Sequence, residues 1–280
     1  MTTLAERFTS ELLDDLQHKR LLLPTLPEVA LKIREVTDDP DASMHDLSTI
    51  IASDPALSAR LIQIANSPLL RTGRQVDNIE SAVNRLGMRM IHDLVTSIVM
   101  QQMFQATSDA TDKRLHQLWE HSTEVAALCH VLAAQFTQLN PEQALLAGLI
   151  HKIGALPVLT KAEDYPELVA DEKALDEIIR LLHPRIGGAI LRSWHFSQEL
   201  IDVAELHENP QRNSEATDLT DLVIVAKLQT QDGAQDYSLS GHKLDDVPAL
   251  SKLGFDSEIS FIEMEGVGDD IRQAQLLLSA

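Results

Sequence analysis

Four histidines in the second half of the chain are the residues best suited to chemistry. His121, His151, His183 and His207 each lie in a stretch with apolar residues at the three- and four-residue spacing of an amphipathic helix. Neutral imidazoles are common metal ligands, and helical bundles build metal centres from inward-facing side chains on successive helices. The pattern therefore allows one shared metal centre, although a single helical histidine is more often a packed or surface residue.

Other catalytic patterns are missing from the sequence. It contains neither glycine-rich phosphate-binding motif (G-x-G-x-x-G or G-x-x-x-x-G-K-[ST]), and no H-E-x-x-H or C-x-x-C zinc pattern. The single cysteine, Cys129, lies on an apolar helical face and is expected in the core. No local motif marks a Ser-His-Asp or Cys-His catalytic set, so that alternative stays open.

The composition is that of an acidic globular protein. The 280 residues are 44% hydrophobic, and 43 acidic against 23 basic residues give a net charge of −20. Residues 201–280 hold 16 acidic and 5 basic residues, and this charge opposes binding to the phosphates of nucleic acids. With one cysteine, no signal-peptide pattern and no apolar run of 18 residues, we expect a cytoplasmic protein without a membrane span.

The elements that must position the histidines are predicted to be helices throughout. Alternating, strand-like runs are scarce, so the fold class is expected to be all-α. Helix starts are marked by proline or capping residues at Pro27, Ser43 with Asp46, Asp54 with Pro55, and Asn140 with Pro141.

Three parts are expected along the chain. Residues 1–108 form an N-terminal helical bundle, which includes helices at 79–86 and 88–104 separated by Gly87. A polar stretch at 105–113 is a candidate link to a second bundle at 109–230. Residues 231–280 are an acidic, partly irregular extension with a last amphipathic helix at about 269–278.

Several motifs resemble the HDOD domain, a degenerate relative of the HD and HD-GYP metal-dependent phosphohydrolases. The resemblance covers about residues 20–230. Its first half rests on Leu23–Pro27, Asp54–Arg60, Ala65–Ser67, Ser81–Val83 and Leu86–Gly87, and its second half on Trp119–Ser122, Ala147–His151 and His183–Trp194. Most members of this family lack the full catalytic set and are thought to act in bacterial signalling.

The resemblance also implies a ligand set, which this chain only partly retains. The superfamily's first-helix histidine corresponds to His121, and its His-Asp pair corresponds to His151 and Lys152. In the two-metal pattern a further histidine corresponds to His183. A His-His pair corresponds to His207 and Glu208, and the closing aspartate aligns near Lys227. Four histidines are kept, and both defining aspartates are replaced by lysine.

These two replacements oppose metal binding. A protonated lysine has no lone pair and repels a divalent cation about 4 Å away by roughly 8 kcal/mol at an effective dielectric near 20. Lys152 either takes the place of the cation and pairs with a carboxylate such as Glu208, or extends to solvent. We therefore expect no catalytic residue, no cofactor and no bound metal, with the four histidines as weak ligand candidates.

Two further patterns suggest alternative sites. His92–Asp93 is a literal His-Asp dipeptide, but it lies in the first bundle, where the family has no ligand. The helices at 79–86 and 88–104, with Arg71, Arg74, Arg85 and Arg89 nearby, are reminiscent of a helix-turn-helix; helical hairpins are far commoner than DNA-binding ones.

The sequence thus predicts a non-catalytic signalling protein that acts through protein partners, its HD-like centre structural or ligand-sensing. The alternative is a metal-dependent phosphohydrolase with an altered site, a cyclic-dinucleotide or nucleotide phosphodiesterase that uses the four histidines and a divalent metal. Nucleic-acid binding is a third, disfavoured reading. The partner, the pathway and self-association into a homo-oligomer are left open.

Overall fold

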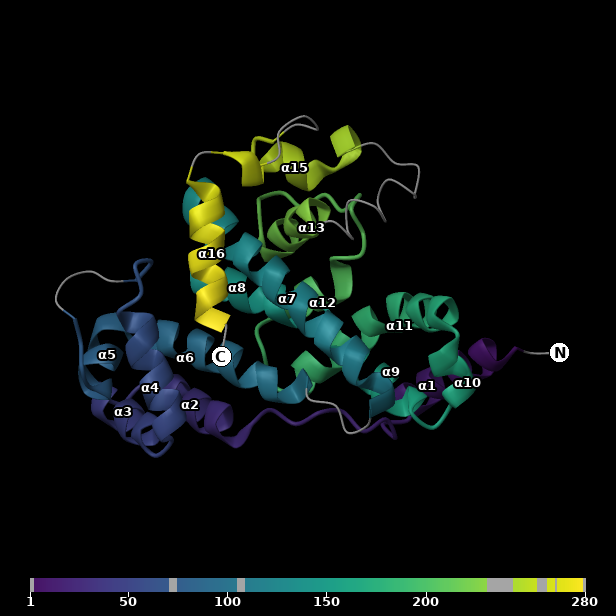
Figure 1. The fold of residues 1–280 in the computed structure, drawn as a ribbon, viewed down its shortest axis with the longest axis horizontal. Helices are drawn as coiled ribbons and strands as arrows, with labels where there is room; N and C mark the ends of the chain where they lie inside the picture. The colour runs from purple at the N-terminus through teal and green to yellow at the C-terminus, as the bar shows by residue number, and fades with distance from the viewer. Residues whose placement is uncertain are drawn as a thin grey trace.

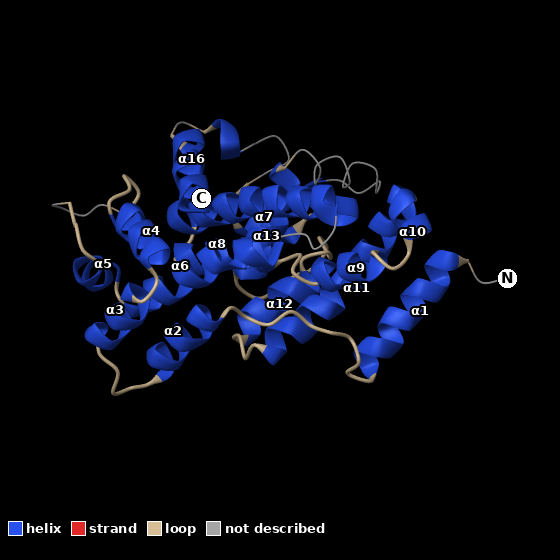
Figure 2. Ribbon diagram, turned by 60° about the horizontal axis from the view of Figure 1, so that its bottom comes forward, coloured by secondary structure: helices blue, strands red, loops and turns tan. Residues whose placement is uncertain are grey.

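A computed structural model describes residues 3–70, 75–104, 109–230, 244–255, 261–264 and 266–278. Within these ranges every regular element is a helix, which confirms the all-α prediction (Figures 1 and 2). Arg71 and Arg74, named in the helix-turn-helix alternative, lie outside the described residues, as does 231–243 of the expected irregular extension.

Among the described residues, the first half of the chain forms six α-helices and a short 3-10 helix. Helices α2 to α6 pack on one another through α2–α3, α3–α5, α4–α5 and α2–α6 contacts. The bounds are α1 Leu4–Gln17, α2 Glu28–Asp38, α3 Met44–Ala52, α4 Pro55–Ala65, α5 Ile79–Leu86, α6 Met88–Met100 and η1 Gln101–Phe104.

The second half is built around the antiparallel pair α7 and α8, against which α13 and α16 also pack. The bounds are α7 Asp109–Phe136, α8 Pro141–Ile150, α9 Ala155–Ala162, α10 Pro166–Ala170, α11 Glu172–Ser193, α12 Gln198–Leu206, α13 Leu219–Gln229, η2 Leu244–Asp246, α15 Pro248–Lys252, η3 Phe261–Glu263 and α16 Val267–Leu278. One continuous set of buried apolar side chains joins both halves.

The predicted helix starts are formed by the expected caps. Ser43 and Asp46 make a reciprocal capping box on α3. The Asp54 side chain accepts from two backbone N–H groups of α4, and the Asn140 side chain accepts from that of Gln143 in α8. Gly87 ends α5 with a φ of 80°, a conformation that favours glycine.

The polar stretch at 105–113 is not wholly a link. Residues 105–108 lie outside the described residues, but Asp109 to Lys113 already belong to α7. Acidic residues are favourable in the first turn of a helix, because they interact with its positive end. The polarity of residues 105–113 predicts a link as far as Lys113, and for residues 109–113 that prediction is wrong.

Two terminal helices cross between the halves. Helix α1 packs on α11, away from α2 to α6 (Figure 1), and its Phe8 ring meets Tyr165 edge-on with centroids 5.0 Å apart. Helix α16 packs on α7, and its last carbonyls accept hydrogen bonds from Arg60 of α4. The first and last helices thereby fasten the two halves together.

The stretch Pro141–Ala162, which contains α8, a turn and α9, is long and apolar enough to cross a membrane by length and composition. From the sequence alone, no such stretch was expected. Of its most apolar window, 83% is buried inside the fold, as is usual for the central helix of a packed core.

Candidate functional site

The structure brings the four predicted histidines together in one row. The ring centroids of His121 and His151 lie 5.5 Å apart, those of His151 and His207 5.0 Å, and those of His207 and His183 5.1 Å. His121 belongs to α7 and His183 to α11, whereas His151 and His207 follow the last residues of α8 and α12. Four segments spread over 87 residues of sequence therefore converge on one centre.

Two glycines permit this convergence. A Cβ at Gly148 would lie 2.5 Å from the Cα of Ala126, so glycine lets α8 approach the backbone of α7. A Cβ at Gly154 would collide with the main-chain carbonyl of His183. Both contacts involve backbone, which cannot move aside as a flexible side chain would, so larger residues would separate the histidines.

Hydrogen bonds fix the orientation of three of the rings. The Nδ1 atoms of His151, His183 and His207 lie 2.5, 2.7 and 2.8 Å from the carbonyl oxygens of Gly148, Ile179 and Val203. A carbonyl oxygen only accepts, so each Nδ1 carries the hydrogen, and in the neutral ring the lone pair is on Nε2. This is the tautomer with which histidines bind metals through Nε2.

The Nε2 atoms face one another rather than a hydrogen-bond donor. Nε2 of His183 lies 3.1 Å from Nε2 of His207. Nε2 of His121 and of His151 are buried and have no hydrogen-bond partner among the described residues. The centre is thus rich in lone pairs, which a cation would stabilise.

Glu208 and Lys227 complete one end of the row. Oε1 of Glu208 lies 3.1 Å from Nε2 of His207 and 3.4 Å from Nε2 of His183. The ammonium of Lys227 lies 2.6 Å from the same carboxylate oxygen. His183, His207 and Glu208 form the group within the described residues whose ligand atoms are close enough to hold one metal ion.

Burial keeps the histidines neutral. It lowers the pKa of His121 to about 3, helped by the charges of Lys152 and Lys227, and it lowers the pKa of His207 to about 3, helped by Lys227. It also lowers the pKa of His151 well below its usual value. The pKa of His183 is lowered by burial too, although the Glu208 carboxylate opposes the shift.

Glu208 is the anion of the centre. Burial by itself would raise the pKa of this carboxyl group, but the charge of Lys227 and its hydrogen bond to the carboxylate outweigh burial and lower the pKa well below its usual value. Because neutral His183 and His207 present lone pairs rather than hydrogens on Nε2, we assign the main stabilisation of the carboxylate to Lys227.

Lys152 stands beside His151, where the superfamily has its aspartate. After burial, the charge of Lys152 also lowers the pKa of His121, His151 and His183. Lys227 is hydrogen-bonded to Glu208. The expectation that Lys152 pairs with a carboxylate such as Glu208 or extends to solvent stays a prediction.

The donor set fits a divalent cation, but its charge balance does not favour one. Two imidazole nitrogens and a carboxylate oxygen are suitable ligands for zinc, iron or manganese, and the unpaired Nε2 atoms of His121 and His151 could add to them. Against this, Lys227 already neutralises the only carboxylate of the set.

Three groups of polar residues lie apart from this row. His92 and Asp93 of α6 pair with each other, Nδ1 to Oδ1 at 3.0 Å. His130 of α7 is buried without a hydrogen-bond partner for either ring nitrogen among the described residues, and the sequence analysis missed it. Asp221 of α13 is fully buried and pairs with Arg212 and Lys252. Its position in the polar first turn of a helix was the only sequence signal for this buried ion pair.

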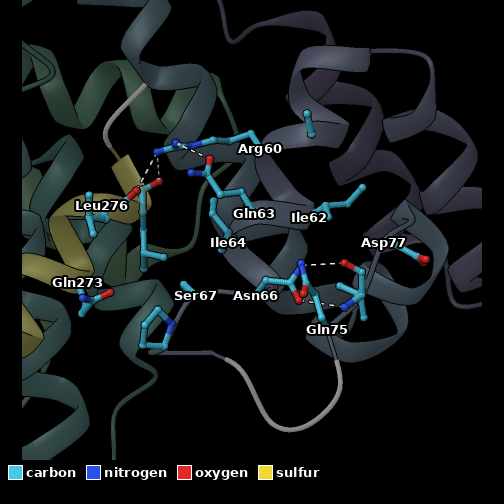
Figure 3. Close-up of a pocket in the computed structure, with 14 residues that line it drawn as sticks. Arg60, Ile62, Gln63, Ile64, Asn66, Ser67, Gln75, Asp77, Gln273 and Leu276 are labelled. Carbon is cyan, nitrogen blue, oxygen red and sulfur yellow. Dashed lines mark hydrogen bonds between the residues drawn. The ribbon is translucent and has the colours of Figure 1, made fainter.

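A cavity of about 650 Å³ opens between α4, the chain that follows it and α16 (Figure 3). At its edge the Arg60 guanidinium donates to the carbonyl of Leu276 at 2.8 Å and to Gln63 Oε1 at 3.1 Å. None of its lining residues is one of the predicted site residues.

Comparisons with known proteins agree with the fold. The family model of the HDOD domain matches residues 23–210. A proposed metal-dependent phosphohydrolase from Shewanella amazonensis is 31% identical, with a TM-score of 0.84 and coverage of 98% of this chain and 99% of the other. A proposed signal transduction protein from Marinobacter aquaeolei is 19% identical, with a TM-score of 0.63 and coverage of 99% and 65%.

Among curated proteins, an uncharacterized protein of Treponema pallidum is 27% identical over 235 residues. The match covers 77% of this chain and 44% of the relative, so the chain spans less than half of that protein's length.

Proposed function

Since the chain belongs to the HDOD domain family, we propose that it is a cytoplasmic signalling protein that acts through protein partners and does not hydrolyse phosphoesters. One observation carries the proposal. Nζ of Lys227 lies 2.6 Å from Oε1 of Glu208, the carboxylate that contacts His183 and His207 among the described residues.

The physical reason is electrostatic. A metal-dependent hydrolase needs a cation that lowers the pKa of water and polarises the phosphoryl group. Here Lys227 supplies a positive charge at the carboxylate, and Lys152 adds another near His121 and His151. Neither ammonium can activate water as a metal does, so the centre keeps its internal charge balance without the catalytic ion.

The names of two similar proteins agree with parts of the proposal. The Marinobacter aquaeolei neighbour is named for signal transduction, which agrees with a signalling role. The Shewanella amazonensis neighbour is named for metal-dependent phosphohydrolase activity, which agrees with the resemblance of the four histidines to the ligand set of such enzymes.

A metal-dependent phosphohydrolase is the second candidate, and a specific observation favours it. The Nε2 atoms of His183 and His207 lie 3.1 Å apart with both Nδ1 atoms turned to carbonyls, so two lone pairs face each other. In this alternative His183, His207 and Glu208 would hold a divalent ion, which would generate hydroxide for attack on a phosphodiester.

Metal analysis and turnover assays separate the two functions. Purified full-length protein is analysed for bound iron, manganese, zinc and magnesium, and is then assayed on cyclic dinucleotides and nucleotides with each metal added. We expect far less than one metal per chain and no turnover above that of His151→Ala. Near-stoichiometric metal would contradict the metal-free centre, and turnover that His151→Ala abolishes would establish the hydrolase.

The partner interaction needs its own experiment. Tagged wild-type protein and His151→Ala are crosslinked in the native host, and crosslinked peptides are mapped onto the chain. We expect both proteins to give the same partner contacts, because the proposed role needs no catalysis. A chain that gives no reproducible contact with another protein would contradict the proposal.

A further inference from the structure

The three ligand atoms at the Glu208 end of the row already have the spacing of a metal site. Their separations are 3.1 Å between the two Nε2 atoms and 3.1 and 3.4 Å from these to Oε1 of Glu208. Ligands about 2.1 Å from a tetrahedral ion lie about 3.4 Å from one another. The triangle is therefore close to the size that a bound ion requires.

The triangle is also oriented by its surroundings. Carbonyl oxygens of Ile179 and Val203 hold the Nδ1–H groups of His183 and His207, so both Nε2 lone pairs are directed away from those backbones. His183 and His207 are 1% and 2% exposed, so little reorganisation of either ring is available or needed. Binding by preoriented ligands avoids much of the ordering cost.

What distinguishes this centre is the cation that it already contains. The ammonium of Lys227 donates to Oε1 of Glu208, the oxygen that faces both imidazoles. A divalent ion among the same three atoms would meet the like charge of this ammonium at close range.

We propose that Lys227 is a built-in cation that blocks a latent metal site, and that its removal alone lets His183, His207 and Glu208 bind a divalent ion. This inference rests on the non-catalytic function proposed above and explains how the chain keeps a metal-ready geometry without a metal. Lys227 acts through Glu208, so it is a positioning residue rather than a ligand.

The test uses Co²⁺, whose ligand-field absorption reports its coordination directly. Full-length wild type and Lys227→Met are titrated with Co²⁺, and Zn²⁺ is measured by competition. Lys227→Met removes the charge and keeps the length of the side chain. We expect Lys227→Met to bind one Co²⁺, with Zn²⁺ displacing the ion, and wild type to bind no Co²⁺ over the same titration range.

Lys252→Met is the matched control. Lys252 is 16% exposed against 15% for Lys227, and its Nζ lies 2.9 Å from Oδ2 of the buried Asp221. Because Lys252 has no imidazoles beside its carboxylate partner among the contacts described, we expect no gain in Co²⁺ binding. A second change, Glu208→Gln in the Lys227→Met background, should abolish the gain.

The outcomes distinguish this inference from the proposed function. If neither wild type nor Lys227→Met binds Co²⁺, the latent site is wrong and the non-catalytic function stands. If both bind it equally tightly, both ideas fail. If wild type binds and Lys227→Met binds at least tenfold more tightly, only the metal-free function fails.

Circular dichroism checks that each variant is folded. If Lys227→Met is unfolded, Lys227→Gln replaces it in the Co²⁺ titration.

Discussion

Replacing His130 by leucine should make the protein more resistant to acid. His130 lies on α7, is 3% exposed, and has no hydrogen-bond partner for either ring nitrogen among the described residues. The nearest carboxylate oxygen, Oε1 of Glu142, is 4.0 Å from Nε2, which is too far for a hydrogen bond. Leucine has a similar volume and leaves no buried polar atom unpaired, so it removes little that is favourable.

The size of this pH effect on stability follows from the lower proton affinity of His130 in the folded state than in the unfolded state. Burial lowers the pKa of His130 to about 4, although the charge of Asp270 opposes the shift, whereas an unfolded histidine titrates near 6.5. As the pH falls below about 6.5 the unfolded state gains a proton that the folded state does not, so stability is lost until about pH 4. At about 1.36 kcal/mol per pH unit, this histidine alone removes about 2 kcal/mol between pH 6.5 and pH 5.

Urea denaturation at pH 7 and pH 5 measures this difference. At pH 7 we expect His130→Leu to be within about 1 kcal/mol of wild type or more stable. At pH 5 its advantage should grow by about 2 kcal/mol, since the other buried histidines titrate alike in both proteins. His116→Leu, on the exposed side of the same helix, is the control and should show no such growth.

Two results would refute the reasoning. One is a pH dependence of stability that is the same in His130→Leu and wild type. His130 would then bind its proton equally well in the folded and the unfolded state. The other is a loss of more than about 2 kcal/mol at pH 7, which would mean that the ring makes favourable contacts that leucine cannot replace.

Three further predictions concern packing and caps. Gly148→Ala should destabilise the protein by about 1–3 kcal/mol in urea denaturation, because its Cβ meets the backbone of α7, whereas Gly268→Ala, with no atom within 4 Å, should not. Asp221→Asn should cost about 3 kcal/mol, since it removes the buried partner of Lys252; an unchanged melting temperature would contradict this. Asp54→Ala should cost about 1 kcal/mol through the lost cap of α4, and a midpoint equal to wild type in denaturant would show that the cap contributes nothing.

The starts of the helices could be predicted from short stretches of sequence. Ser43 with Asp46, Asp54 before Pro55, and Asn140 before Pro141 all cap the helices that they were expected to cap. A cap depends on residues within four positions along the chain, so it needs no information about the rest of the fold. The all-α class and the family resemblance could be predicted for the same reason, because both rest on short stretches of sequence.

The pairing of charges could not be predicted in the same way. The sequence places Lys152, Glu208 and Lys227 near one centre but leaves open which carboxylate each lysine contacts. The contact with Lys227 depends on how α12 packs against α13, which no residue spacing along one helix specifies. For the same reason the unpartnered ring of His130 and the docking of α1 on α11 were missed.

The amino-acid sequence by itself therefore determined the helices, their first turns and the four histidines that line one centre. Only the tertiary structure decided that Lys227 contacts Glu208 and which ring nitrogens of the described residues lack a hydrogen-bond partner. The physical reason is range: a helix and its caps are held by neighbours along the chain, whereas burial and ion pairing depend on which helices meet in space.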